Sequence, residues 1–363
     1  MTISPPICYD VAMNILLTSA GRRTYLVDYF KQALGAEGLV YAANSVKSPA
    51  LEQADGAVLT PLIYDAAYIP FLLNFCKTHG IGLLVPLFDV DLPVLAAHRA
   101  EFSAEGVVLA VSEMETLAAC NDKARMAERL CAAGIPTPKL CLSEANVRDR
   151  LLAGRLQFPL LLKPRFGMGS IAVERVETEA ELSVLAERCR REIQKSYLRY
   201  ETAETLSEPL LFQQWVEGAE YGLDVVNDFS GQYMTTIVRR KLAMRAGETD
   251  EAVVLGETDE AYPLLTELGK KLSKVFAHIG NMDVDVLLQR EKDGGSVPYV
   301  IDMNARFGGG YPFSQLAGAD LPRAYICWAK GQSAPADCFQ VKAGVHGYKA
   351  LSLRAYGEMK LEQ

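Results

Sequence analysis

The chain has 363 residues, of which half are hydrophobic and 23% are charged, as in an ordinary globular protein. This length allows two or three domains of about 100–200 residues each. Acidic residues outnumber basic ones by 45 to 37, and the formal net charge is −8. A mild acidic excess argues against nucleic acid or an anionic membrane as the main partner, because binding to phosphate backbones needs a basic surface.

The eight cysteines and four histidines are scattered, and the sequence contains no Cys-x-x-Cys pair and no cluster of metal ligands among them. No stretch approaches the ~20 apolar residues that span a bilayer. Residues 1–12 contain Pro5 and Pro6 and lack the features of a signal peptide, so we expect a loose extension there. Free thiols without a leader favour a reducing compartment, which predicts a cytoplasmic protein.

Short apolar runs alternate with amphipathic stretches over the next hundred residues. We predict strands at 14–18, 40–43, 57–59, 83–86 and 107–110, and helices up to about residue 34, at 67–79 and at 92–101. This alternation indicates parallel pairing in βαβ units, so residues 13–112 are predicted to form a Rossmann-like α/β domain. Segment 19–23 follows the first strand at a helix start, a natural anion site, but its spacing does not predict dinucleotide binding.

From residue 113 the pattern changes to an α+β arrangement with antiparallel sheet. A helix is predicted to end at Gly134, which is followed by Pro136. The further predicted strands are 160–163, 172–176, 210–216, 221–227, 233–239, 282–288 and 299–303, and the further helices are 179–197 and 263–278.

A strand that ends in Lys163 leads into the glycine-containing turn at 165–170. Glycines let backbone N–H groups approach an anion, and a lysine supplies a mobile charge for phosphate. The lysine precedes the glycines, so this is not a P-loop. By itself the pattern fits a plain hairpin turn with a solvated lysine equally well.

Asp302 and Asn304 alternate on a predicted strand, and Arg306 continues the same spacing before three glycines at 308–310. Side chains at i and i+2 leave the same face of a strand. Oxygen ligands on one face suit Mg²⁺, and the arginine suits an anionic substrate group. The glycines are expected to let the backbone come close to a ligand.

Asp283 and Asp285 share a face of the preceding strand. Pairing with the strand at 299–303 would gather three carboxylates and an amide, which requires cations nearby. Ordinary surface charge is the alternative. The basic run Arg239 to Lys241 has two interpretations as well, a solvated strand end or, with Arg239 and Lys241 on one face, the wall of a phosphate or substrate pocket.

The segment Gln213 to Glu220, which includes Gln214, Trp215 and Val216, joins two predicted strands, and Glu220 follows Val216 by four residues. A strand edge with free backbone groups can hydrogen-bond an adenine, and a glutamate can accept from ribose hydroxyls. A β-turn at 217–220 explains the same residues.

The order of these pieces resembles the ATP-grasp superfamily, which includes D-alanine–D-alanine ligase, biotin carboxylase and the carbamoyl-phosphate synthetase large subunit. The pattern of the carbamoyl-phosphate-synthetase-like single-chain ATP-grasp ligases is similar to residues 13–23, 120–123, 134–138 and 239–241. The likeness extends from about residue 13 to 331. It implies a Rossmann-like pre-ATP-grasp domain, then an ATP-grasp domain at 113–363 with a small lid lobe at about 137–216 and a large lobe at about 217–363.

The resemblance also implies a role for each matched residue. Nucleotide contacts are implied for Lys123, Lys163, Gly167, Met168, Gly169, Ser170, Gln213, Gln214, Trp215, Val216 and Glu220. Asp285, Asp302 and Asn304 would bind Mg²⁺, with two ions expected and Mn²⁺ as an alternative, and the candidate catalytic residues are Arg306, Lys241 and Arg239. Asp302 stands where many members have the longer glutamate, and Gln213 replaces another common glutamate.

The activity implied is that of an ATP-dependent carboxylate–amine ligase in biosynthesis, which forms an acyl phosphate and releases ADP and phosphate. The partners would be a small-molecule carboxylate and an amine, without nucleic acid or membrane, and a homodimer is considered. Two alternatives are an ATP-grasp kinase with a stable phosphorylated product and a non-catalytic ATP-binding module. Carbamoyl phosphate synthesis is disfavoured, because the resemblance implies two ATP-grasp modules and a glutaminase for that reaction, and this chain has room for one module.

Overall fold

The computed structural model describes residues 13–167, 171–201, 208–353, 355, 361 and 362. The chain divides into two compact units. The described residues of Met1–Val111, Asp320–Cys338 and Leu353–Gln363 form the first unit, and those of Ser112–Ala319 and Phe339–Ser352 form the second. The expected extension at 1–12 lies outside the described residues. Within the described stretches, no helix combines the length and apolar character needed to cross a bilayer.

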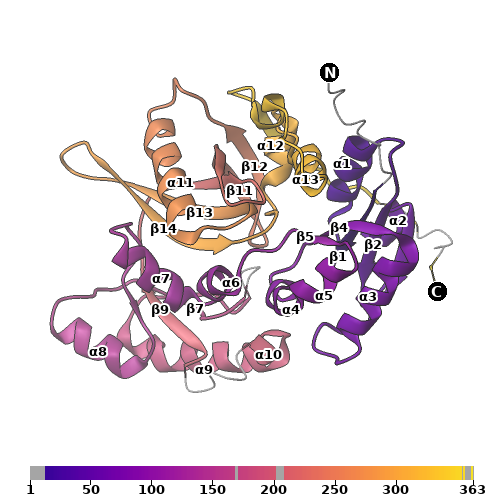
Figure 1. The fold of residues 1–363 in the computed structure, drawn as a ribbon. Coiled ribbons are helices and arrows are strands. Elements are labelled where there is room, and N and C mark those ends of the chain that lie inside the picture. Colours follow the sequence, from indigo (N-terminus) through magenta and orange to yellow (C-terminus); the bar gives the residue numbers. More distant parts are fainter. Residues whose placement is uncertain (1–12, 168–170, 202–207, 354, 356–360, 363) are drawn as a thin grey trace. The chain divides into compact units, whose positions relative to one another are not determined.

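The first unit contains a parallel five-stranded sheet in the order β3-β2-β1-β4-β5 (Figure 1). Its strands are β1 (Asn14–Thr18), β2 (Val40–Asn44), β3 (Gly56–Leu59), β4 (Ile81–Pro86) and β5 (Val108–Leu109). Its helices include α1 (Thr24–Leu34), α2 (Pro49–Gln53), α3 (Tyr68–His79), α4 (Asp91–Ala97) and α5 (Arg99–Ala104). Successive residues of β1 are buried after Asn14, so both sheet faces are covered, as in other parallel sheets. The predicted α/β fold of this region is confirmed.

A late helix, α13 (Leu321–Ala329), belongs to this first unit. The ring of its Tyr325 lies 6.3 Å from the ring of Phe30 on α1, edge to face. Lys330, just after α13, forms an ion pair with Glu37. The observed division of the chain therefore differs from the predicted domain limits, which placed all residues after 112 in one domain. Local pattern shows that a segment is helical, but not which sheet it will pack against.

The second unit contains two antiparallel sheets, of which the smaller has the order β6-β9-β7-β8. Its strands are β6 (Leu140–Cys141), β7 (Leu160–Pro164), β8 (Glu174–Val176) and β9 (Leu210–Gln214). The helices of this region are α6 (Met114–Asn121), α7 (Lys123–Ala132), α8 (Glu144–Leu152), α9 (Glu179–Lys195) and α10 (Leu198–Glu201). The strand predicted at 172–176 begins only at Glu174, because Ala172 adopts a left-handed conformation with φ 53°.

The larger sheet has six strands in the order β14-β13-β10-β11-β12-β15. They are β10 (Ala219–Asn227), β11 (Tyr233–Arg245), β12 (Glu248–Val254), β13 (Gly280–Arg290), β14 (Ser296–Asn304) and β15 (His346–Tyr348). Helix α11 (Tyr262–Phe276) lies against one face of this sheet, with Gly269 tight against Thr236 of β11 (Figure 1). The short helix α12 (Tyr311–Leu316) follows β14.

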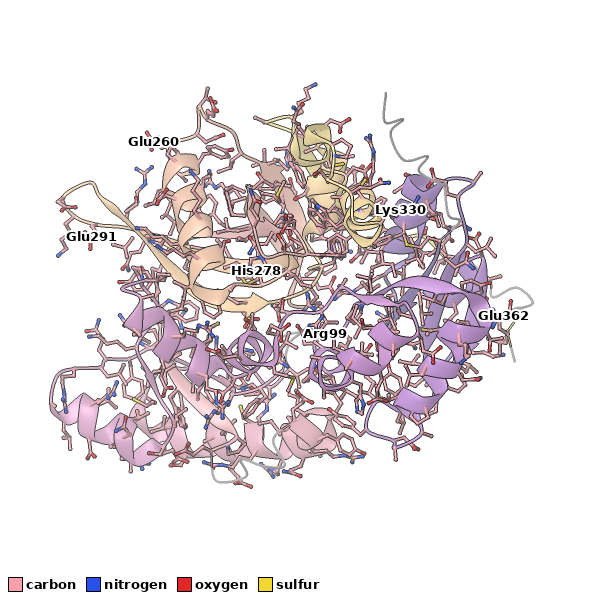
Figure 2. The ribbon with its side chains drawn as sticks, viewed as in Figure 1. Arg99, Glu260, His278, Glu291, Lys330 and Glu362 are labelled. Carbon is pink, nitrogen blue, oxygen red and sulfur yellow. The ribbon has the colours of Figure 1, made fainter. Side chains whose placement is uncertain are left out.

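The joint between α11 and β13 is held by a buried histidine. His278, which is labelled in Figure 2, is fully buried and its Nε2 lies 2.9 Å from the carbonyl oxygen of Val225. Burial lowers the pKa of His278 to about 4, so the ring is neutral at physiological pH. Asn227 donates a hydrogen bond of 2.8 Å to the carbonyl of His278. These contacts fix the entry of β13 into the sheet.

Two of the differences between predicted and observed elements are the division of a helix and the long extension of a strand. The helix predicted at 92–101 is divided into α4 and α5 at His98. The strand predicted at 233–239 continues to Arg245, so the basic run is part of β11 and not a strand end. A left-handed Ala246 and Gly247 then turn the chain into β12.

Candidate active site

The face of the large sheet opposite α11 carries a row of charged side chains, which we call the charged face. Alternation along the strands brings to it Glu220 of β10, Arg239 and Lys241 of β11, Asp283 and Asp285 of β13, and Asp302 and Asn304 of β14. Asp285 lies directly opposite Asp302, and Asp283 lies opposite Asn304. The structure thus gathers the three carboxylates and the amide that the sequence predicted from pairing of these two strands.

Lys241 neutralises two of the acids on the charged face. Its Nζ lies 2.7 Å from Oδ1 of Asp285 and 2.8 Å from Oε1 of Glu220. Burial by itself lowers the pKa of Lys241, but the two carboxylates outweigh it and raise the pKa above its ordinary value. The lysine therefore stays protonated and holds Glu220 and Asp285 in fixed positions.

Arg239 is surrounded by protein, with only 2% of its surface exposed. Its guanidinium forms an ion pair with Asp224, donates a hydrogen bond of 2.6 Å to Oγ of Ser314 and lies 3.4 Å from Asp283. Asp224 also accepts a 3.0 Å hydrogen bond from Asn281 and a 2.6 Å hydrogen bond from Ser314. These contacts leave the guanidinium engaged by the protein's own side chains.

Two of the three glycines after Arg306 make room for side chains of the charged face. A Cβ added at Gly308 would lie 2.0 Å from Cγ of Asp283, and one at Gly310 would lie 2.9 Å from Nη2 of Arg239. Around Gly309 the nearest atom would be 3.6 Å away. At Gly308 and Gly310 the missing side chain makes room for Asp283 and Arg239. The expectation that these glycines bring the backbone close to a ligand stays a prediction.

Two buried lysines from the region of the small sheet face Asp302. Lys123, the first residue of α7, donates a 2.6 Å hydrogen bond to the carbonyl of Gly167, and its Nζ lies 3.3 Å from Oδ1 of Asp302. Lys163, at the end of β7, donates a 3.3 Å hydrogen bond to the carbonyl of Ile301. Burial, together with the charge of Lys123, lowers the pKa of Lys163 to about 8. Burial raises the pKa of Asp302, but the two lysines lower it below its ordinary value.

An ion pair that the sequence analysis did not single out holds these lysines in place. Nε and Nη2 of Arg165 donate hydrogen bonds of 2.8 Å to the two carboxylate oxygens of Asp122. The same carboxylate accepts from the backbone N–H of Ala124 and so caps the start of α7. Because Asp122 precedes Lys123 and Arg165 follows Lys163 by two residues, this pair joins the segments that carry both lysines.

A cavity of ≈ 480 Å³ adjoins Lys163 and, through Glu220, the charged face. Its lining comes from strands β7, β8, β9, β10, β13 and β14, from the segment after β9 and from the residue Pro138 ahead of β6. The residues are Pro138, Leu161, Lys163, Arg175, Gln213, Gln214, Trp215, Val216, Glu217, Gly218, Glu220, Leu287 and Ile301. The guanidinium of Arg175 stacks over the ring of Trp215 at 4.4 Å. A cavity with apolar side chains, the aromatic Trp215 and a few charged groups, among them Lys163 and Glu220, suits a flat heterocycle with a charged extension.

Arg306 lies near the carboxylates, but not by continuing the strand. Strand β14 ends at Asn304, and Arg306 is buried in the bend that follows, where its Nη1 donates a 2.9 Å hydrogen bond to the carbonyl of Phe307. Its positive charge helps to lower the pKa of Asp302. The i, i+2 spacing thus predicted the correct region for Arg306, but the bend after β14, and not the strand itself, places the side chain there.

The oxygen atoms on the charged face fit a hard divalent cation by donor type. Oδ1 of Asp302 is buried and has no hydrogen-bond partner, although Lys123 is close. Among the residues with described positions, no three His, Cys, Asp or Glu side chains are gathered to hold a metal ion. The predicted set of Asp285, Asp302 and Asn304 contains two carboxylates and one amide, so the remaining ligands would come from substrate phosphates and water.

The structure therefore gathers most of the predicted residues at one place in the second unit. Gln213, Gln214, Trp215, Val216 and Glu220 line the cavity, and Lys123, Lys163, Asp285, Asp302, Asn304 and Arg306 lie on or beside the charged face. Met168, Gly169 and Ser170 lie outside the described residues, and segment 19–23 belongs to the first unit. Asp122 and Arg165 lie in the segments 120–123 and 165–170 that the sequence had pointed to, but their pairing was not predicted. Asp224, Asn281 and Ser314 carried no prediction. Only Asp224 had a clear signal, an acid within an apolar strand.

Two family models match this chain. The model described as "PylC-like, N-terminal domain" matches residues 15–110, and the model described as "ATP-grasp in the biosynthetic pathway with Ter operon" matches residues 206–348. The chain thus contains one region similar to PylC-like N-terminal domains and one similar to ATP-grasp domains. The second match includes every charged-face residue of the large sheet, from Glu220 to Asn304.

Curated relatives of this chain include the carbamoyl phosphate synthase large chains of Xylella fastidiosa (strain Temecula1) and Mycobacterium bovis. They are 22% and 25% identical over 251 and 258 residues, in each case 68% of this chain. The chain spans only about a fifth of the length of these relatives, 22% and 21% respectively.

Solved structures show the same fold. A biotin carboxylase from Campylobacter jejuni matches with a TM-score of 0.69 and 18% identity, over 92% of this chain and 74% of that one. An L-amino acid ligase from Bacillus licheniformis matches with a TM-score of 0.67 and 20% identity, over 88% and 76%. The biotin carboxylase domain of the Hydrogenobacter thermophilus 2-oxoglutarate carboxylase, solved with MgADP, has a TM-score of 0.69 and 18% identity, over 92% and 73%.

Proposed function

We propose that this protein is an ATP-dependent ligase that activates a carboxylate as an acyl phosphate and transfers the acyl group to an amine. The observation that carries the proposal is the convergence of two buried lysines, an oxygen-rich charged face and a cavity of ≈ 480 Å³ at one place. The named activities of the ligase and carboxylase structures with this fold support the same reaction class.

The cavity would hold the adenine and ribose of ATP, with Gln213 and the backbone of Val216 at the ring and Glu220 at the ribose. Lys163 is a buried cation that lines the cavity, and Lys123 is a buried cation beside Asp302, so both would contact the phosphates. Asp285, Asp302 and Asn304 would hold Mg²⁺, which when bound supplies neutralising charge to the phosphates. We infer two ions, with Mn²⁺ as a possible substitute.

In the proposed reaction, a carboxylate oxygen of the substrate attacks the γ-phosphorus and ADP leaves. The amine then attacks the acyl carbon, phosphate leaves and the amine loses a proton. The protein's part is positioning and charge stabilisation, without a covalent intermediate on the enzyme. Arg306 is the candidate to steady the acyl phosphate. We assign Arg239 and Lys241 positioning roles, since their cationic groups are engaged by Asp224, Asp283, Glu220 and Asp285.

The test is release of ADP and phosphate from ATP across pairs of carboxylic acids and amines, with amino acids and sugar acids as the first set. A ligase releases both products in equal amounts and only when both co-substrates are present. ADP without free phosphate would indicate a kinase, and no ATP consumption with any pair would contradict an enzyme of this class.

Two variants connect the activity to the site. Lys163→Ala and Asn304→Ala are expected to abolish turnover without unfolding the protein, as checked by circular dichroism. Lys195→Ala, an exposed lysine at the end of α9, serves as the matched control and should keep full activity. Full activity in both site variants would contradict the assignment. We further infer a cytoplasmic enzyme acting on small molecules, and light scattering will test for a homodimer.

A further inference from the structure

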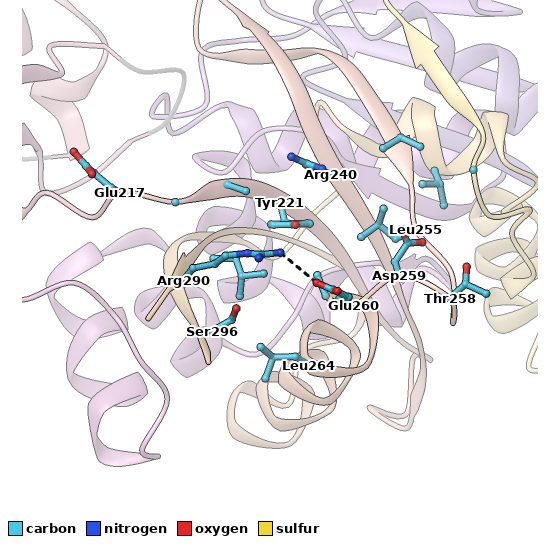
Figure 3. Close-up of a pocket in the computed structure, with 17 residues that line it drawn as sticks. Glu217, Tyr221, Arg240, Leu255, Thr258, Asp259, Glu260, Leu264, Arg290 and Ser296 are labelled. Carbon is cyan, nitrogen blue, oxygen red and sulfur yellow. Dashed lines mark hydrogen bonds and ion pairs between the residues drawn. The ribbon is translucent and has the colours of Figure 1, made fainter. Parts of the chain in front are cut away.

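A second cavity lies on the α11 side of the large sheet, opposite the charged face (Figure 3). Its size is ≈ 700 Å³, compared with ≈ 480 Å³ for the candidate nucleotide cavity. Both sizes are in the range of small-molecule sites, about 300–1,000 Å³. The floor consists of strands β10 to β13, and the wall consists of the segment from β12 to the first turn of α11.

Strand alternation separates the two cavities. Glu220 lines the nucleotide cavity and Tyr221 the second one, and Leu287 and Leu288 are divided in the same way. On β11, Lys241 belongs to the charged face and Arg240 lines the second cavity. Glu217 and Gly218 line both cavities. This shared segment is the direct physical link between them.

Arg240 is an exposed side chain that lines the second cavity and is the candidate contact for a ligand there. Both of its chain neighbours, Arg239 and Lys241, have carboxylate partners, whereas Arg240 makes no hydrogen bond or ion pair with any residue whose position is described. The other arginine of the cavity, Arg290, is paired with Glu260 at 3.2 Å, the dashed contact in Figure 3. A free guanidinium in a pocket can bind a carboxylate in two parallel hydrogen bonds.

The remaining lining narrows the class of ligand. Two arginines face three carboxylates, those of Glu217, Asp259 and Glu260, so the cavity is not electropositive and disfavours polyanions such as nucleotides. The rest of the lining includes apolar side chains, namely Tyr221, Val253, Leu255, Leu264 and Leu288. One free cation, several carboxylates and an apolar wall match a zwitterion with an apolar body.

We propose that this cavity is an effector site for an amino acid with an apolar side chain, whose carboxylate binds Arg240 and whose ammonium faces the acidic side chains. Its effect on the nucleotide site passes through the shared segment. A Cβ added at Gly218 would lie 2.6 Å from the carbonyl oxygen of Leu288, so the backbone of Gly218 is tight against β13. A ligand seated on Leu288 therefore limits the positions open to Gly218 and changes the nucleotide cavity on its other side.

The test uses the whole protein and isothermal titration with leucine, isoleucine, valine, methionine and phenylalanine. Leucinamide lacks the carboxylate and N-acetylleucine lacks the ammonium. Their affinities show whether each charged group contributes to binding. The variant Arg240→Gln removes the proposed partner of the carboxylate. Arg245→Gln is the matched control, because Arg245 lies on the same strand outside the cavity and pairs with Asp250.

The expected result is binding of at least one of the five amino acids, weakened about tenfold or more by Arg240→Gln and unchanged by Arg245→Gln. Both modified leucines should bind more weakly than leucine. Saturation with the amino acid should change the dissociation constant of MgADP by about fivefold or more in the wild type, with no change in Arg240→Gln.

Three outcomes would overturn the inference. They are no binding of any of the five amino acids, equal binding to the wild type and Arg240→Gln, and binding that leaves MgADP affinity unaltered. Binding that survives Arg240→Gln would place the amino acid elsewhere, such as in a substrate site on the charged face. The amino-acid titrations without nucleotide do not depend on the proposed ligase activity. Their results can therefore be interpreted even if the protein is not a ligase.

Discussion

The residues around the charged face are packed so closely that adding a single methyl group is expected to change the stability of the protein. Gly308 and Gly309 are adjacent, yet their surroundings differ. A methyl group at Gly308 would overlap the carboxylate of Asp283, with a distance of 2.0 Å, whereas one at Gly309 meets nothing nearer than 3.6 Å. The pair therefore offers an internal comparison.

We expect Gly308→Ala to destabilise the protein by about 1–3 kcal/mol, because Asp283 or the bend must move. Gly309→Ala should change the free energy of unfolding by less than about 0.5 kcal/mol. Urea unfolding followed by fluorescence measures both. Equal stability of the two variants would show that the bend relaxes at no cost and that Asp283 is not held by it.

Lys163 predicts a pH dependence of nucleotide binding. Its pKa is lowered to about 8, first by burial, so it is cationic below that pH and neutral above it. Since the proposed phosphate contact needs the cation, affinity for ADP in the free protein should fall as pH rises through about 8, by up to about tenfold per pH unit. Titration calorimetry between neutral and alkaline pH measures it.

The control for this prediction is Lys163→Arg, because a guanidinium stays protonated throughout the range. Its affinity can be lower than that of the wild type, but it should not vary with pH across this window. A wild-type affinity that is flat through pH 8 would contradict the predicted titration of Lys163.

At the scale of elements, the pair Asp122 and Arg165 couples the start of α7 to the segment after β7. Asp122 combines two functions, a cap on the helix and a partner for the guanidinium. Asp122→Asn keeps an acceptor for the N–H of Ala124 but removes the charge, whereas Asp122→Ala removes both. The two substitutions therefore separate helix stability from positioning of the lysines.

We expect Asp122→Ala to be less stable than Asp122→Asn by about 1 kcal/mol, the usual value of a helix cap. Both should weaken ADP binding, since Lys123 loses its fixed position. Ser143→Ala serves as a control, because Ser143 caps α8 through Asn146 in the same way. It should lose a similar stability and keep full affinity. Unchanged ADP affinity in both Asp122 variants would refute the coupling.

Much of the element order follows from local pattern. The strands of the parallel sheet and the pairing of the two acidic strands were predictable because apolar alternation and spaced carboxylates are local signals. Short elements such as β6 and α10 were not predicted, since two to four residues carry too little pattern. The contacts of Arg239 could not be foreseen either. They join residues that are 15, 44 and 75 positions apart in sequence.

At the scale of the whole molecule, the first unit is discontinuous in sequence. Phe30 of α1 meets Tyr325 of α13, and Ala57 of β3 bridges Leu361. A fragment of residues 1–112 would leave part of the apolar surface of α1 uncovered, because α13 is missing. We expect this fragment to bind a hydrophobic dye and to melt at a lower temperature than the same fragment joined by a flexible linker to residues 320–338.

Thermal unfolding by circular dichroism, with dye binding in parallel, compares the two fragments. A third fragment in which the linked segment carries Tyr325→Ala should behave like residues 1–112 alone, since the ring contact to Phe30 is lost. If residues 1–112 alone unfold at the same temperature as the linked fragment and bind no dye, α13 is not needed to complete the unit.

The return of α13 to the first unit also has a consequence for timing during synthesis. About 200 residues separate Val111 from Asp320. At a translation rate of roughly 5–20 residues per second, the first unit waits about 10–40 s for its last helix. Throughout that interval, nearly all of the second unit leaves the ribosome. The domain that is made first is therefore the one that is finished last, and its incomplete form is the state that chaperones in the cell would encounter.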